Sequence, residues 1–504
     1  MRLKPLLTNL AASIVTLLLM LTALELFLRT QWWAGFKQQR EARLLDQDLQ
    51  ALIHSRNVSA STFNIYYFGE SSMQGEPYAP SVSIPQLVSY MLDGQVEGRP
   101  IKSVNLAASG ADFAYDLRRL HSVLAQRQLT SPSLCVIYAG HNEFLKYHQD
   151  FVDWFPLHPR LLAEAARVLK LYRLEMGERR FFDAPVVDAR TRRRVITTYR
   201  KQLLEAVRLL REHHIPVIVL TLAGNYSRWQ PNRSAFCGRR SDREEFSRLM
   251  EAGNQAAAAA RVEPAIAAYR QALALCDHFA ETHYRLGQSY EAGGDWAQAW
   301  REYSQAVDDD GMPMRALSAQ NDFIRRLGAA GLASTIDVVE RWRRQAAGGL
   351  IGFNFLIDAH HPNLNGYIMI SRLIAERIAA LFSAQPRALR TVGTDTLREV
   401  FHVTPAQRLE VYVSRGRWLT RLATWRYDPS ERLTLAEAFF LRALAIDPSR
   451  YEPYVGMAMV SLLRRDVVTA EMYRSEARLL DAAAVDTYFR DYWVRRVVHY
   501  GYAP

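Results

Sequence analysis

Residues 64–75 read Asn-Ile-Tyr-Tyr-Phe-Gly-Glu-Ser-Ser-Met-Gln-Gly, a β-rich run followed by a polar turn that glycines bound. The run at 64–68 is rich in aromatic and β-branched residues, which favour a strand, and Gly69 marks its end. Ser71 therefore lies just past the carboxyl end of a strand. In α/β proteins, functional residues gather at that edge of a parallel sheet. This stretch predicts both a strand and a candidate site.

Four further apolar runs predict strands of the same sheet, at 103–107, 134–138, 215–222 and 333–339. The run at 134–138, Leu-Cys-Val-Ile-Tyr, is apolar throughout, as expected of a strand buried on both faces. Helical segments separate the runs, and one of them extends from about 193 to 213. This alternation predicts an α/β fold with a parallel sheet.

Three more polar blocks accompany the first one along the chain. They lie at 105–110, at 140–143 (Gly-His-Asn-Glu) and at 358–363 (Asp-Ala-His-His-Pro-Asn). Together the four blocks supply a nucleophile, oxyanion donors, a base and a carboxylate that can orient the base. Ester cleavage through a serine requires these groups. The sequence therefore predicts the type of chemistry but not the substrate.

The four blocks resemble those of the SGNH hydrolases, also called the GDSL esterase/lipase superfamily. The resemblance covers about residues 60–225 and 315–385. It implies a three-layer α/β/α fold with a flavodoxin-like sheet and a carboxylic ester hydrolase activity. The residues that it implies are the catalytic Ser71, Asp358 and His361, and the oxyanion-hole groups of Ser71, Gly110 and Asn142.

Elementary chemistry supports these roles. A serine hydroxyl is a poor nucleophile unless a neighbour takes its proton, and an imidazole ordinarily titrates near neutrality. His361 is the candidate base, and Asp358 would hold its tautomer and stabilise its protonated form. Taken singly, each of these residues also fits a turn or a helix cap, so the argument rests on the four blocks in order. The mechanism predicts neither a metal nor a cofactor.

The chain departs from the family pattern at three positions. Glu70 and Glu143 stand where the family has aspartate, so they keep the charge and change only the local geometry. Ser72 stands where the family has leucine and is a rival nucleophile, although the glycine spacing of the block favours the preceding serine. His360 is a rival base, but the Asp-x-x-His spacing favours its neighbour.

An apolar stretch near the N-terminus predicts a membrane anchor. Residues 6–28 form 23 mostly apolar positions, preceded by Arg2 and Lys4. At about 1.5 Å per residue they can span a hydrocarbon core of roughly 30 Å. Without a small-residue cleavage site, we expect an uncleaved signal-anchor at 1–30 and a helical linker at 31–59. Basic residues flank both sides, but the short tail favours a single-pass protein with an extracytoplasmic or periplasmic body.

Charge and cysteine content add weaker indications. The net charge is +11 and the pI is about 9.5. A cluster of basic residues lies between positions 190 and 201. It could contact anionic lipid or an acidic polymer, or it could form a solvated helix face, which is the interpretation that we favour. No nucleic-acid motif accompanies it. Cys135 is expected to be buried, and Cys237 and Cys276 could pair in an oxidising compartment. The cluster comprises Arg190, Arg192, Arg193, Arg194, Arg200 and Lys201.

The middle of the chain resembles the tetratricopeptide family, whose repeats are 34 residues long. Small and aromatic positions recur at that spacing, so that paired helices could approach closely around an aromatic ring. The alternative is a set of ordinary alanine-rich helical hairpins. The two matching sets are Ala252, Gly253, Ala256, Ala265, Tyr269 and Ala272, and Leu286, Gly287, Tyr290, Ala299, Tyr303 and Ala306. Partial copies include Ala436, Phe440, Ala443 and Pro448, then Tyr454, Ala470 and Ala477.

These patterns predict an interrupted hydrolase domain. Its parts lie at 60–227 and 316–385, around a helical insertion at 228–315, and a second helical region follows at 386–504. The helical parts would pack together beside the active site, and their concave surface would suit either docking of a protein partner or binding of a polymer. Three functions compete: an esterase that removes acyl groups, such as acetyl, from an envelope glycan; an O-acyltransferase acting on a cell-envelope polysaccharide; and a scaffold for envelope proteins with a secondary esterase fold.

Overall fold

The structure, a computed structural model, describes Met20 and residues 61–125, 132–148, 186–382, 388–424, 426 and 428–490. Within the ranges 60–118 and 130–504, the described residues form one compact unit, which contains the candidate site and both helical regions. The predicted anchor and linker fall outside the described residues, except for Met20. No helix among the described residues combines the length and apolar character needed to cross a membrane.

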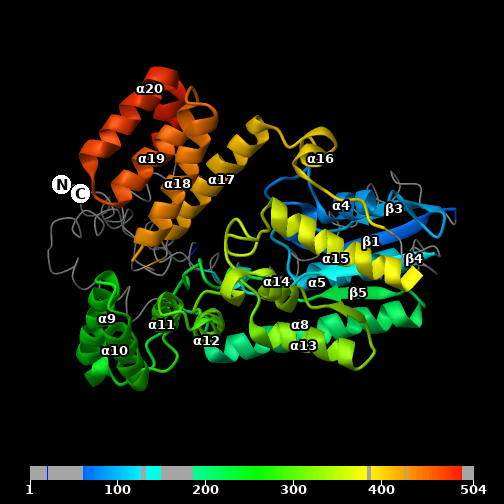
Figure 1. Cartoon of the computed structure of the whole chain (residues 1–504), viewed down its shortest axis with the longest axis horizontal. Helices are drawn as coiled ribbons and strands as arrows, with labels where there is room; N and C mark the ends of the chain where they lie inside the picture. Colours follow the sequence, from blue (N-terminus) through cyan, green and yellow to red (C-terminus); the bar gives the residue numbers. More distant parts are fainter. Residues whose placement is uncertain are drawn as a thin grey trace, which may run out of the picture. The chain divides into compact units, whose positions relative to one another are not determined.

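A six-stranded sheet forms the centre of the fold, in the order β2-β3-β1-β4-β5-β6 (Figure 1). The short β2 pairs antiparallel with β3, whereas every other pair is parallel. The five parallel strands therefore follow the order 2-1-3-4-5 of doubly wound flavodoxin-like sheets, whose topological switch point lies between β1 and β4. The strands are β1 (Phe63–Gly69), β2 (Gln95–Val96), β3 (Arg99–Asn105), β4 (Ser133–Tyr138), β5 (Val217–Leu220) and β6 (Ser334–Ile336).

Three strands, β3, β5 and β6, end earlier than their apolar runs predict, and polar side chains stop two of them. At the end of β3, the Asn105 side chain accepts a hydrogen bond from Ala107 N at 3.2 Å, which turns the chain. After β6, Asp337 caps a helix by accepting from Glu340 N at 3.1 Å. Val338 therefore starts helix α14 (Val338–Gln345) rather than extending the strand. The two-residue β2 was not expected from the sequence.

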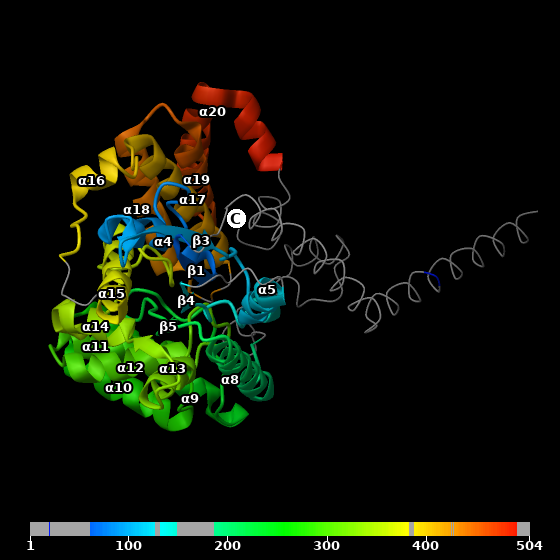
Figure 2. The same cartoon turned by 90° about the vertical axis from the view of Figure 1, so that its right-hand side faces the viewer.

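Helices cover both faces of the sheet. Helices α4 and α15 pack against each other on one face, and α8 lies on the other, packed against β5 and α13 (Figure 2). Tyr199 of α8 is buried, and its hydroxyl donates to Ala139 O at 2.9 Å. The helices are α3 (Ser71–Gln74), α4 (Ile84–Met91), α5 (Phe113–Ala125), α8 (Ala189–Glu212), α13 (Ser318–Ala329) and α15 (Leu364–Phe382).

Between β5 and β6 the chain forms two helical hairpins. Each has a glycine packed on a tyrosine ring 16 positions later: a Cβ on Gly253 would lie 2.5 Å from Tyr269, and one on Gly287 would lie 2.8 Å from Tyr303. The glycines thus let the helices approach closely. A disulfide joins Cys237, which precedes the first helix, to Cys276. The helices are α9 (Arg243–Ala258), α10 (Val262–Leu275), α11 (Ala280–Ala292) and α12 (Trp296–Asp308).

The C-terminal region is a second helical array. Phe440 of α18 packs between Gly416 of α17 and Gly456 of α19, where a Cβ on either glycine would lie within 2.5 Å of its ring. Helix α17 also contacts the α/β domain, because Gln407 Nε2 donates to Tyr78 O at 2.8 Å. The helices are α16 (Thr394–Glu399), α17 (Pro405–Ala423), α18 (Ser430–Ile446), α19 (Tyr451–Leu463) and α20 (Val467–Arg490).

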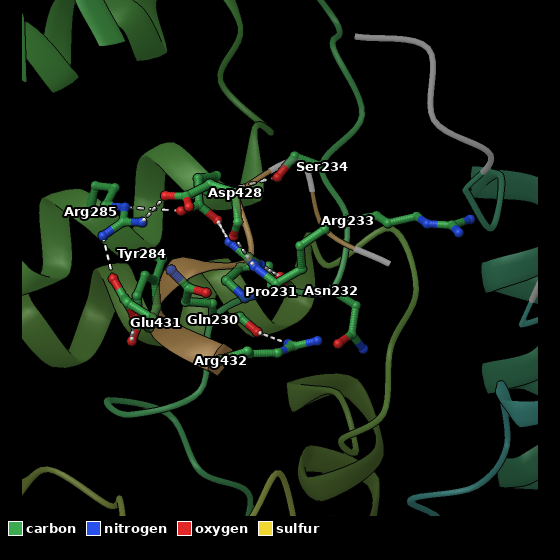
Figure 3. Close-up of polar contacts among 12 residues, drawn as sticks. Gln230, Pro231, Asn232, Arg233, Ser234, Tyr284, Arg285, Asp428, Glu431 and Arg432 are labelled. Atoms are coloured by element: carbon green, nitrogen blue, oxygen red, sulfur yellow. Dashed lines mark hydrogen bonds and ion pairs between the residues drawn. The ribbon is translucent and has the colours of Figure 1, made fainter. Parts of the chain in front are cut away.

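Ion pairs join the two helical regions directly. Figure 3 shows Arg285 of α11 between Asp428 and Glu431, at the start of α18. Nearby, Arg426 Nη2 lies 2.7 Å from Glu281 Oε2. Arg426 is 5% exposed, so this pair is held away from water. The insertion and the C-terminal helices therefore contact each other beside the sheet.

Candidate active site

The first three polar blocks leave adjacent strands of the sheet at the same edge. Beyond β3, Leu106 N donates to Tyr67 O at 2.8 Å and Ala108 N donates to Gly69 O at 3.1 Å. The block after β3 therefore follows the end of β1. On the other side, Gly69 pairs with Tyr138 of β4. The candidate site thus lies at the switch point, where ligands bind in this class of sheet.

Glu70 connects the first block to the third. Its Oε1 accepts from Gly140 N at 2.8 Å and from Asn142 N at 3.2 Å, and its Oε2 accepts from His141 N at 3.2 Å. Burial and the neighbouring Glu143 raise the pKa of Glu70 well above its ordinary value, against the two bonds to Oε1, which lower it. Gly140 has φ 138°, a conformation that favours glycine, and a Cβ there would lie 2.6 Å from Leu222.

The structure brings three of the predicted residues into a hydrogen-bonded row. Ser71 Oγ lies 2.8 Å from His361 Nε2. His361 Nδ1 lies 2.8 Å from Asp358 Oδ2 and 2.9 Å from Asp358 Oδ1. Because the carboxylate accepts only, Nδ1 carries the proton and Nε2 is free to accept from the serine hydroxyl. Ser71 and His361 are 290 positions apart in the chain.

The two rival residues take other positions. Ser72 Oγ donates to His360 O at 3.4 Å and does not contact an imidazole nitrogen. Neither ring nitrogen of His360 has a hydrogen-bond partner within the part of the chain that the structure describes. Its ring stacks on His141 instead, with centroids 4.8 Å apart. The geometry therefore favours Ser71 over Ser72 as the candidate nucleophile and His361 over His360 as the candidate base.

The predicted oxyanion groups lie on the flanking loops. Asn142 is 9% exposed, and its buried Nδ2 has no hydrogen-bond partner among the described residues. Gly110 is exposed in the loop after β3 with φ 74°. No hydrogen bond joins Gly110 to Ser71, Asn142 or the Asp358–His361 pair in the described ranges.

Asp358 is held from several sides within a tight loop. Its Oδ1 accepts from the backbone N–H groups of His360 at 3.1 Å and His361 at 2.9 Å. The loop is attached to the chain beyond β5, because Asn225 Nδ2 donates to Asp358 O at 3.1 Å and Asn225 N donates to Ala359 O at 2.8 Å. The carboxylate is fully buried. Its rotamer is therefore fixed before any substrate binds.

Arg415 of α17 reaches the same carboxylate, a contact that the sequence reasoning missed. Its Nη1 lies 2.8 Å from Asp358 Oδ2. Although burial alone would raise the pKa of Asp358, His361 and Arg415 hold it well below its ordinary value. Its guanidinium also lies 5.3 Å from the ring centre of Trp418. The C-terminal region thus contributes to the surroundings of the predicted triad.

Aromatic rings complete these surroundings. Trp418 meets His361 edge-on, with centroids 6.2 Å apart, and stacks on Trp229 at 5.6 Å. Burial lowers the pKa of His141 to about 3, and burial and His361 lower that of His360, so both rings are neutral at pH 7. Neither tryptophan belongs to a motif that the sequence analysis identified.

One group of side chains has the composition of a metal site. Potential ligand atoms of Asp358, His360 and His361 lie within 4.8 Å of one another. However, the Asp358 carboxylate already accepts a hydrogen bond from His361 Nδ1 and forms an ion pair with Arg415. A divalent ion would have to displace both contacts, so the described residues fit the hydrogen-bonded row better than a metal centre.

Comparisons with known proteins complete the description. No family model matches the chain, and no curated protein matches it. Among solved structures, the lipase/acylhydrolase from Enterococcus faecalis is similar to it, with 14% identity and a TM-score of 0.29. That match covers 65% of this chain and 100% of the other.

Proposed function

We propose that this protein is a serine esterase of the SGNH type, with Ser71 as nucleophile, His361 as general base and Asp358 as the group that orients the base. The observation that carries the proposal is the continuous row from Ser71 Oγ to Asp358, with both links at 2.8 Å. Nucleophile and base lie within the distance at which a proton can transfer.

In the proposed reaction, Ser71 Oγ attacks the ester carbonyl carbon while its proton passes to His361 Nε2. The imidazolium then gives that proton to the departing alcohol oxygen, which leaves an acyl-serine. Water then attacks the acyl carbon while the same nitrogen takes its proton. The bond between the acyl carbon and Ser71 Oγ breaks, the imidazolium returns the proton to Oγ, and the carboxylic acid is released. Asp358 stays ionised throughout and stabilises the imidazolium.

The developing oxyanion needs donors that are in place beforehand. The unpartnered Nδ2 of Asn142 supports its role as one donor, and the N–H groups of Ser71 and Gly110 are the proposed others. Removing one such donor typically lowers kcat by about two to three powers of ten. The loop geometry around Glu70 would hold the asparagine in place during turnover.

We further propose that residues 6–28 anchor the protein and that it acts outside the cytoplasm on an acylated envelope glycan. Two observations support this location: the apolar stretch and the Cys237–Cys276 disulfide, a bond typical of oxidising compartments. The acyl group would be small, such as acetyl. The helical regions are proposed to bind an envelope protein.

Hydrolysis of 4-nitrophenyl acetate by the purified full chain tests the esterase proposal. We expect Ser71→Ala and His361→Ala each to lower kcat by about four to six powers of ten, because nucleophile and base act as one unit. Ser72→Ala is the matched control and should retain most of the activity. Release of 4-nitrophenol that is independent of Ser71 would contradict the proposal. An acetylated glycan, with and without a second acceptor glycan, then separates hydrolysis from acyl transfer.

A further inference from the structure

The contact of Arg415 with Asp358 brings a cation from the C-terminal helices against the carboxylate of the predicted triad. Arg415 lies on α17, beyond the end of the α/β domain, yet its side chain is only 11% exposed. Its Nη1 shares Asp358 Oδ2 with His361 Nδ1, and both distances are 2.8 Å. One carboxylate oxygen therefore separates the guanidinium from the base.

Several contacts hold Arg415 in this place. Trp418, one helical turn further along α17, lies beneath its guanidinium and against the edge of His361. Helix α17 begins against the α/β domain through Gln407 and Tyr78. At its other end, the Arg426–Glu281 pair ties the following segment to the insertion. Such a fixed cation does not behave as a surface charge that salt would screen.

A buried cation beside an aspartate has two opposing effects on the base. It fixes the carboxylate rotamer that faces Nδ1, which favours proton transfer. Its charge also opposes the positive charge that the imidazole gains when it takes a proton. The other titratable groups near His361 and Asp358 among the described residues include His360, His141, Tyr78 and Tyr367, and none of these four carries a positive charge at pH 7. Arg415 is thus the cation in direct contact with this pair among the described residues.

We propose that Arg415 is a positioning residue of the active site: it holds Asp358 against His361 and places a fixed positive charge one carboxylate oxygen away from the imidazole. This inference rests on the proposed esterase function. It also means that the C-terminal helices complete the catalytic site rather than serving only to bind partners.

The test compares pH profiles of kcat/KM for the full chain and three variants. Arg415→Met removes the charge while keeping most of the apolar stem. We expect it to lower kcat by about 10- to 100-fold with a smaller change in KM, and to move the acid limb of the profile to higher pH by about one unit. Arg415→Lys keeps the charge, so its limb should stay close to that of the wild type. Arg421→Met, at an exposed position of the same helix, is the matched control and should change neither quantity.

A second measurement does not depend on activity. In full chains labelled at histidine and carrying Ser71→Ala, NMR follows the titration of the His361 ring, which His361→Gln identifies. We expect the midpoint to rise when Arg415→Met is added and to stay unchanged when Arg421→Met is added. If the methionine variant fails to fold, Arg415→Gln replaces it as a neutral polar side chain.

The outcomes distinguish the two proposals. If hydrolysis depends on Ser71 but the acid limb is unchanged in the neutral Arg415 variants, the positioning role is overturned and the esterase function is retained. Absence of Ser71-dependent hydrolysis in the wild type overturns the function, and the NMR titration then decides whether Arg415 acts on the imidazole. Equal midpoints in the presence and absence of the guanidinium reject the inference in either case.

Discussion

Replacing Glu70 tests how the first and third polar blocks are held together. The residue is 1% exposed, and its carboxyl group accepts three backbone N–H bonds from the 140–142 turn. Glu70→Gln keeps the shape and an amide oxygen that can replace Oε1, so the bonds from Gly140 and Asn142 persist. The new NH₂ group then faces His141 N, which loses its acceptor. Glu70→Ala removes all three acceptors at once.

The expected loss of stability depends on how many backbone N–H groups lose their acceptor. Leaving one buried N–H unpaired costs about 1–3 kcal/mol, so Glu70→Gln should lower the free energy of unfolding by that amount. Glu70→Ala should cost roughly 3 kcal/mol or more, because three donors lose their partner and a cavity forms. The alanine variant also frees the Asn142 loop, so we expect kcat to fall by about two to three powers of ten, as for loss of an oxyanion donor. The glutamine variant keeps that loop and should lose less than about tenfold.

The pH dependence adds a second check on Glu70. The folded chain raises its pKa well above 4.5, so the folded state retains this proton when the unfolded chain has released it. Stability is therefore greatest below pH 4.5 and falls as pH rises toward the folded value. Glutamine does not titrate, so the difference between wild type and Glu70→Gln should shrink as pH rises. Urea unfolding at pH 5 and pH 8, with kcat on 4-nitrophenyl acetate, measures both effects. An alanine variant with wild-type stability, or with wild-type kcat, would refute the proposed connection.

Two further predictions concern other buried positions. Burial raises the pKa of Glu143 from 4.5 to about 7, although the hydrogen bond from Phe113 N acts in the opposite direction. The free energy of unfolding of the wild type should therefore fall by about 3 kcal/mol as the pH rises from 4.5 to 7. Glu143→Gln keeps an acceptor for that N–H and should flatten this part of the urea-unfolding profile; an unchanged slope would contradict the assignment. In the insertion, Gly287→Ala places a methyl group 2.8 Å from Tyr303 and should cost about 1–3 kcal/mol, whereas Gly393→Ala meets nothing within 4 Å. Equal thermal midpoints for the two alanine variants would show that the close approach is not needed.

The strands were the most predictable part of the fold. Buried parallel strands are continuous apolar runs, and the run at 134–138 corresponds to β4 at Ser133–Tyr138. Their ends were less predictable, because side-chain hydrogen bonds set them. Asn105 and Asp337 each turn the chain inside an apolar run, and apolar patterning does not register that effect. The edge strand β2 has only two residues, too few for any periodicity.

The candidate site was predictable where its residues lie in motifs. Ser71, Asp358 and His361 belong to short blocks, and their spacing also selected them over Ser72 and His360. Arg415 lies in no motif, on a helix that reads as one more amphipathic segment. Its role follows from the position of α17 beside the loop at 355–363, which depends on tertiary packing. A local pattern carries no information on such a contact.

The placement of the insertion explains how residues 290 positions apart can meet. The chain enters and leaves the helical hairpins at one point, where Asp310 Oδ1 accepts from Asn232 N at 3.0 Å on the way in and from Met312 N at 3.0 Å on the way out. Arg315, just beyond, donates to Asn225 O at 2.6 Å and lies 3.6 Å from Asp310. Both charged groups are almost fully buried, so this closure is held firmly. Since Asn225 also holds the loop of Asp358, the inserted segment begins and ends close to this loop, and His361 keeps its position beyond the end of β5.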